Sequence, residues 1–102
     1  MNQQIFNEIQ ALKRQILPNE KVILFGSQAR GDAGEDSDWD LLVLLDKEKT
    51  NFNKDYKEYA YPFYNIGFKY GTHISIIIDA KKEWETHPSL LRYNVEREEI
   101  ER

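Results

Sequence analysis

A short polar segment joins two very apolar runs between residues 25 and 45, and it constrains the fold more than any other stretch. It reads FGSQARGDAGEDSDWDLLVLL, so that a Gly-Ser pair ends the first run and an Asp-x-Asp opens the second. The LLVLL run is too apolar for a strand with one exposed face, which predicts a central strand over residues 38–45, covered on both sides. Because side chains alternate along a strand, we expect Asp38 and Asp40 to project from the same face and Trp39 from the other.

This arrangement predicts a site for a phosphate and a metal ion. Two carboxylates on one strand face repel each other, and a hard cation such as Mg²⁺ offsets that repulsion. Gly26 lets the backbone approach a ligand closely, and the N–H groups of a short helix opening at Ser27 attract anions. Taken alone, a Gly-Ser turn or an Asp-x-Asp strand start is most often structural. The combination at this spacing is much more specific and predicts a nucleotide or metal site.

The same residues carry a resemblance to a known family. The segment GSQARGDAGEDSDWD, with Gly-Ser, ten intervening residues and Asp-x-Asp, resembles the signature of the minimal nucleotidyltransferases of the DNA polymerase beta superfamily. The ARG after the serine and the serine before the first carboxylate belong to that resemblance. It implies an α/β (α+β), polymerase-beta-like nucleotidyltransferase fold, a small mixed sheet flanked by helices, in a single domain spanning residues 1–102.

The resemblance also implies a reaction and its residues. Asp38 and Asp40 would be the catalytic residues and the ligands of Mg²⁺, and Gly26, Ser27 and Arg30 would bind the ATP substrate. An acceptor hydroxyl would attack the α-phosphorus in line, and pyrophosphate would leave. The residues alone leave three roles open for Arg30: a plain surface cation, a phosphate ligand, or a side chain that holds the loop before Asp38.

Three functions fit such a chain. Family members of this size commonly act as the antitoxin of a two-protein module and transfer AMP to a helical HEPN-type toxin, which the resemblance implies here. The alternative is a catalytically weak or inactive binding module that neutralises a partner by contact alone. A third function is transfer to a small molecule such as an aminoglycoside, for which the chain is short to build an acceptor pocket by itself. Homo- and hetero-oligomers both remain open.

The residue at one position of the strand after the long helix distinguishes the enzyme from the contact-only binding module. In the resembling family it supplies a third carboxylate, and on this chain it is THISIII, residues 72–78, where the expected counterpart is Ser75. A serine hydroxyl supplies neither an anionic metal ligand nor a base. Asp79 follows at roughly 13 Å along a strand, too far to replace it. His73 is interpreted as a structural or edge histidine.

Composition narrows the function further. A length of 102 residues allows one core, so an active site must be open or shared, and a net charge of −4 with a pI near 5.2 makes a nucleic-acid partner unlikely in the absence of a basic patch. The chain has no cysteine, which excludes disulfides. No apolar run approaches the roughly 20 residues of a spanning helix, and the N-terminus does not resemble a signal peptide, so we expect a cytoplasmic protein without a membrane contact.

The remaining elements follow from apolar periodicity. A helix ending before Pro18 is predicted from apolar positions at 5, 9, 12 and 16, a strand at residues 21–25, and a short helix at 27–30. Helical spacing runs from Phe52 to Tyr70, with Thr50 or Asn51 as the cap, and Pro62 predicts either a kink or a restart.

The C-terminal third continues this mixed pattern. Gly71 ends the long helical segment, and Asp79 is predicted to cap a short helix over residues 81–85. A last helix over residues 89–101, with Pro88 at its start, is expected to turn Leu91 and Val95 inward.

Overall fold

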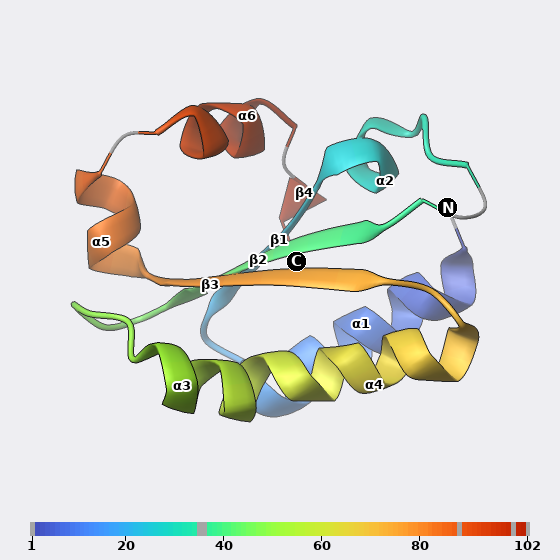
Figure 1. Cartoon of the computed structure of the whole chain (residues 1–102), viewed down its shortest axis with the longest axis horizontal. Coiled ribbons are helices and arrows are strands. Elements are labelled where there is room, and N and C mark those ends of the chain that lie inside the picture. The colour runs from blue at the N-terminus through green and yellow to red at the C-terminus, as the bar shows by residue number, and fades with distance from the viewer. Residues whose placement is uncertain (1, 35–36, 88, 99, 102) are drawn as a thin grey trace.

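The protein is a small sheet with helices on both faces, seen in a computed structural model that describes residues 2–34, 37–87, 89–98 and 100–101 (Figure 1). The elements in chain order are α1 (Gln3–Ile16), β1 (Lys21–Phe25), α2 (Gly26–Arg30), β2 (Trp39–Leu45), α3 (Phe52–Asp55), the π-helix η1 (Tyr56–Ala60), α4 (Tyr61–Tyr70), β3 (Ile74–Ala80), α5 (Lys81–Thr86), α6 (Leu90–Glu98) and β4 (Ile100–Glu101). The predicted mixed fold is therefore confirmed. Within the described part of the chain, no helix is both long and apolar enough to cross a membrane.

The sheet is mixed, and β2 lies inside it. The strand order is β3-β2-β1-β4. Strand β1 pairs antiparallel with both β2 and β4, whereas β2 and β3 are parallel. Parallel neighbours need a long crossover, and the helical segment from α3 to α4 provides it. The prediction that the LLVLL strand is central is confirmed.

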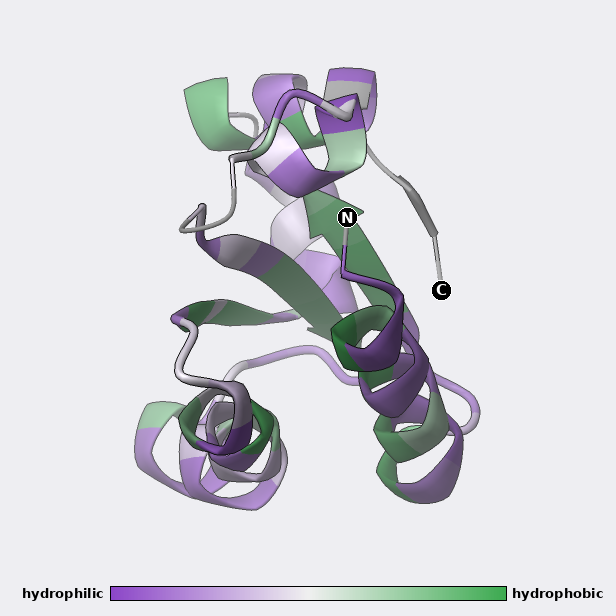
Figure 2. Cartoon of the chain, turned by 90° about the vertical axis from the view of Figure 1, so that its right-hand side faces the viewer, coloured by the Kyte–Doolittle hydropathy of each residue, from purple (hydrophilic) through white to green (hydrophobic). Residues whose placement is uncertain are grey.

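Both faces of the sheet are covered by apolar side chains, and Figure 2 shows the green, apolar strands between helices on either side. Residues of α1 and α4 cover one face, where the buried core includes Ile9, Leu24, Trp39, Leu41 and Phe63. Residues of α5 and α6 cover the other face, where Ile23, Leu42, Leu44, Trp84 and Val95 form a smaller cluster. Trp39 and Leu42 thus belong to opposite faces, as the strand alternation predicts.

Pro62 follows a widened turn of the long helical segment. The segment from Phe52 to Tyr70 stays helical throughout, but the turn just before the proline is the π-helix η1, and Pro62 lies in the first turn of α4. Proline has no N–H to donate to the preceding turn and its ring crowds a carbonyl there. A widened turn relieves both conflicts, so the helix neither stops nor restarts. Asn51 is the cap of α3, because its side chain accepts from the N–H of Lys54.

Strand β3 begins later than predicted. Gly71 ends α4 in the left-handed conformation with φ 64°, as expected, but the N–H of Thr72 still donates to the carbonyl of Gly67 at 2.9 Å. Because that bond belongs to the end of the helix, the strand runs over Ile74–Ala80 rather than residues 72–78.

The C-terminal predictions were partly wrong. Asp79 lies within β3 and accepts from the hydroxyl of Thr50 at 3.1 Å, so it does not cap α5. The last helix ends at Glu98, and β4 pairs with β1 where the sequence predicts more helix, because the edge of β1 offers unpaired backbone groups. Val95 is buried as predicted, whereas Leu91 is 37% exposed. The prediction for Pro88 lies outside the described residues.

Candidate functional site

The predicted site residues meet where β1 ends and where β2 and β3 begin. Asp40 pairs with Phe25, the last residue of β1, on one side and with Ser75 of β3 on the other. Directly paired residues on neighbouring strands point to the same face of a sheet. Asp40 therefore stands between the start of α2, which follows Phe25, and the hydroxyl of Ser75.

Gly26 makes room for the carboxylate of Asp40. Its φ is +74°, and a Cβ added to it would collide with Oδ2 of Asp40 and come within 3.3 Å of Cγ. Both the left-handed backbone and the close approach exclude a larger residue. The space that the sequence assigned to an approaching ligand is thus filled by a site residue, which brings Asp40 against the backbone that leads into Ser27.

Asp38 lies just before β2 and contacts a histidine. Its Oδ2 is 3.2 Å from Nδ1 of His73, and the two side chains are 54% and 69% exposed. The backbone is fixed at the next residue, because the N–H of Trp39 donates to the carbonyl of His73 at 3.0 Å and the Trp39 side chain is buried in the opposite core. The sequence interpretation of His73 as structural missed this contact. A parallel register that pairs Asp40 with Ser75 also sets His73 beside Asp38, and that is the signal that finds it.

Ser27 is held by a very short helix. Its carbonyl accepts from the N–H groups of Gly31 at 3.0 Å and Asp32 at 3.2 Å, and Gly31, with φ 81°, ends α2. The N-terminus of α2 has no side-chain cap. Five residues carry a small dipole, so the useful groups here are the Ser27 hydroxyl and the individual N–H groups of the first turn.

Arg30 contacts the loop that follows α2. Its Nε lies 3.2 Å from Oδ2 of Asp32, and the two side chains are 46% and 62% exposed. Of the three roles that the sequence leaves open, this pair is consistent with holding the loop. An exposed pair of this kind contributes little to stability.

Gln28 is a site neighbour that sequence reasoning missed. It follows Ser27 in α2, is 5% exposed, and its Nε2 donates to the carbonyl of Ser37, the residue before Asp38. No periodicity or motif in the sequence marks a glutamine at this position as buried.

The donor set fits a hard cation. Asp38 and Asp40 supply carboxylate oxygens from either side of Trp39 in the sequence, and Ser75 supplies a neutral hydroxyl next to Asp40. Oxygen ligands of this kind suit Mg²⁺, which takes water for its remaining positions. Among the described residues no group of three or more histidine, cysteine or acidic side chains could hold a metal. A metal here would rely on two carboxylates.

Comparisons with known proteins identify the family and the fold of the chain. The model of the nucleotidyltransferase domain family matches residues 5–101. A solved putative minimal nucleotidyltransferase is similar at 27% identity and a TM-score of 0.62, over 96% of this chain and 92% of that one. No curated protein gives a match.

Two further solved structures are similar in fold. One is a toxin–antitoxin with AMP-PNP, at 18% identity and a TM-score of 0.63, over 93% of this chain and 69% of that one. The other is a mutant of the toxin–antitoxin MntA–HpeT, at 18% identity and a TM-score of 0.62, over 95% of this chain and 70% of that one.

Proposed function

Because the chain belongs to the nucleotidyltransferase domain family, we propose that it binds ATP with Mg²⁺ at the start of β2 and transfers AMP to a partner protein as an antitoxin. The partner is a HEPN-type toxin, and the transfer takes place in the cytoplasm. The likeness to solved toxin–antitoxin structures, one of them with AMP-PNP, supports a toxin partner and an adenine nucleotide, and the HEPN type rests on the family resemblance alone.

One observation carries the proposal: the Gly-Ser turn and the carboxylate pair converge on one point of the sheet. Asp40 packs against Gly26, and Asp38 is two residues before it, just ahead of β2. Asp38 and Asp40 would hold Mg²⁺, which would supply positive charge against the negative charge on the α-phosphate and the leaving pyrophosphate. The hydroxyl of Ser27 and the N–H groups that follow it bind the terminal phosphates.

The chain's own residues then orient the reaction. Arg30, tied to Asp32, keeps the loop after α2 beside the phosphates. An acceptor hydroxyl of the partner attacks the α-phosphorus, a P–O bond forms, and the bond to pyrophosphate breaks. The hydroxyl proton passes to water, because the residue next to Asp40 is Ser75, whose hydroxyl is no base. We therefore expect slow transfer.

Ser75 also favours a second candidate function. A chain that keeps the fold and the nucleotide but lacks a third carboxylate beside Asp40 could neutralise its partner by contact alone. In that case the toxin would be inhibited without modification.

Incubation with the toxin and with ATP labelled at the α-phosphorus separates the two functions. Transfer predicts label on the toxin that depends on Mg²⁺ and disappears in Asp40→Asn. Inhibition of the toxin without label, in both the parent and Asp40→Asn, would establish the contact-only module instead. Absence of both effects would contradict the antitoxin proposal.

A further inference from the structure

Gln28 occupies a position where packing alone does not account for a glutamine. The side chain is 5% exposed, and its Oε1 is buried without a hydrogen-bond partner. A buried acceptor that has lost water and gained no donor destabilises the folded state. A methionine of similar length would fill this space without that defect.

The amide nitrogen of Gln28 connects α2 to the segment that precedes Asp38. Nε2 of Gln28 donates to the carbonyl of Ser37 at 3.2 Å, across nine residues of the chain. Gln28 directly follows Ser27, and Ser37 directly precedes Asp38. One hydrogen bond thus links the residue after the predicted phosphate ligand to the residue before the predicted metal ligand.

Other hydrogen bonds hold the chain on either side of the Ser37 carbonyl. Ser37 also closes a turn, because its Oγ accepts from the N–H of Gly34 at 2.9 Å and its own N–H donates to the Gly34 carbonyl at 3.2 Å. On the far side, Trp39 is held by the His73 carbonyl. Among the described residues, the bond from Gln28 ties the carbonyl of Ser37 to α2, next to the backbone of Asp38.

We propose that Gln28 is a positioning residue: through Ser37 it fixes Asp38 relative to Ser27, so that carboxylate and phosphate-binding groups meet one Mg²⁺–nucleotide complex. This rests on the proposed function for the ligands, but the link between α2 and the loop stands on the structure. Outer-shell partners that orient metal ligands typically change metal affinity by about 10–100-fold when removed. Gln28 makes no contact with the reacting atoms in this role.

The test compares Gln28→Met with the parent chain. The variant keeps the approximate length of the side chain and removes the donor to Ser37 together with the unpartnered Oε1. We expect the Mg²⁺ concentration for half-maximal ATP binding to rise about tenfold, while the affinity for ATP without Mg²⁺ stays the same. Hydrogen exchange at the amides of Gly34 and Trp39 should become faster in the ligand-free protein.

Asn51→Ala is the matched control, because it removes the cap of α3, beyond the opposite end of β2, and lowers stability without touching this loop. It should leave the Mg²⁺ dependence and both amides unchanged. Equal Mg²⁺ dependence in Gln28→Met and the parent would overturn the positioning role, as would unchanged exchange at both amides. If the parent binds no ATP, the proposed function fails, and the exchange rates alone then decide for or against the link.

Discussion

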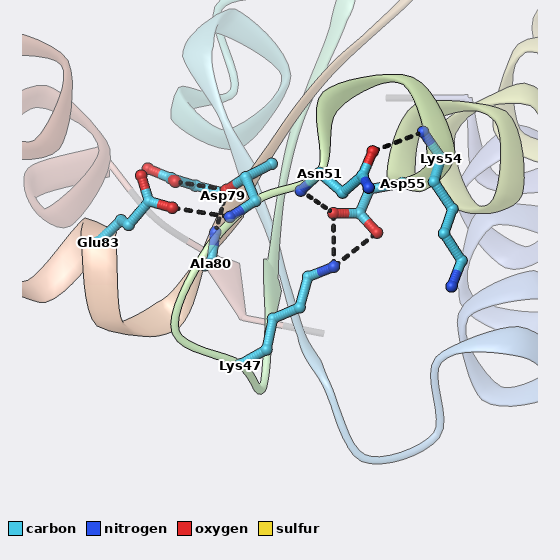
Figure 3. Close-up of polar contacts among 8 residues, drawn as sticks. Lys47, Asn51, Lys54, Asp55, Asp79, Ala80 and Glu83 are labelled. Carbon is cyan, nitrogen blue, oxygen red and sulfur yellow. Dashed lines mark hydrogen bonds and ion pairs between the residues drawn. The ribbon is translucent and has the colours of Figure 1, made fainter.

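Carboxylates at the two ends of the sheet differ in their exposure and in the donors that the protein offers them. At the end beyond β2, Asp55 is 1% exposed and accepts both from Nζ of Lys47 and from the N–H of Asn51, each at 2.7 Å (Figure 3). At the site end, Asp38 is 54% exposed and its carboxylate faces the exposed His73. The first carboxylate has dedicated donors inside the protein, and the second is open to a ligand.

Thr50 extends the contrast. Its N–H donates to Oε1 of Glu83 at 2.7 Å and its hydroxyl donates to Oδ1 of Asp79 at 3.1 Å, while the same hydroxyl accepts from the N–H of Ala80 at 2.8 Å (Figure 3). Asp79 and Glu83 therefore hold the loop after β2 against β3 and α5. A carboxylate that the protein itself pairs with hydrogen-bond donors stabilises the fold. A carboxylate that is left exposed is instead a candidate for binding a ligand.

The largest expected effect comes from adding a carboxylate to the site end. Ser75→Asp places an acid directly beside Asp40, where the proposed metal site has no third anion and the proposed transfer has no base. General-base help is typically worth about 10²–10⁴-fold, so transfer of labelled AMP to the toxin should accelerate by up to that factor.

Stability provides the check on this variant. Three close carboxylates repel, so Ser75→Asp should melt at a lower temperature than the parent without Mg²⁺ and recover when Mg²⁺ is added. A variant that is folded, shows this recovery and still transfers no AMP to an acceptor known to bind would favour the contact-only module.

Exchanging one carboxylate at each end should break different properties. Asp40→Asn removes a proposed metal ligand, and we expect Mg²⁺-dependent ATP binding to weaken by at least about tenfold. Calorimetric titration with and without Mg²⁺ measures this. Equal affinities in Asp40→Asn and the parent would exclude the metal site.

Asp55→Asn is the counterpart at the other end. It leaves Lys47 beside a neutral amide and weakens the contact to Asn51. Because the Lys47 side chain is 36% exposed, water takes up part of its charge, and we expect a loss of about 1–2 kcal/mol in the free energy of unfolding. Chemical denaturation measures the loss. ATP binding should be unchanged, and a loss of binding without a loss of stability would reverse the assignment of the two ends.

Much of this difference is visible in the sequence, because it depends on local patterns. The alternation of Asp38, Trp39 and Asp40 before LLVLL predicts the central strand, its two covered faces and the side on which the carboxylates lie. The Gly-Ser turn predicts a close approach to the backbone at position 26, but the group that approaches is the carboxylate of Asp40 rather than a ligand. The strand features are set by neighbours along the chain, and the structure agrees with them.

The contacts that the sequence does not reveal connect distant segments. Asp79 lies just before α5, a position typical of a helix cap. Its carboxylate instead accepts a hydrogen bond from the hydroxyl of Thr50, which is distant along the chain. The pairing of Asp38 with His73 requires the register of two parallel strands, and the role of Gln28 requires the path of the loop that returns to Ser37. Each is decided by tertiary packing, which periodicity along one segment does not report.

The smallest effect should come from a carboxylate that is paired but lies at the surface. Glu8 of α1 accepts from the hydroxyl of Tyr70 and, at 3.1 Å, from Nζ of Lys69, which connects α1 to the end of α4. The hydrogen bond from Tyr70 and then that from Lys69 lower the pKa of Glu8 in the folded state.

A carboxyl group with a lowered pKa stabilises the fold above the ordinary carboxyl value of about 4.3. It loses that contribution as the pH falls from there through the folded-state pKa. Glu8→Gln should therefore melt slightly below the parent at pH 7, and the two melting curves should converge in acid, below about pH 4. A difference in melting temperature that persists unchanged in acid would mean that Glu8 acts by packing rather than by charge. A difference as large as that of Asp55→Asn would show that pairing, rather than burial, distinguishes the structural carboxylates from those of the site.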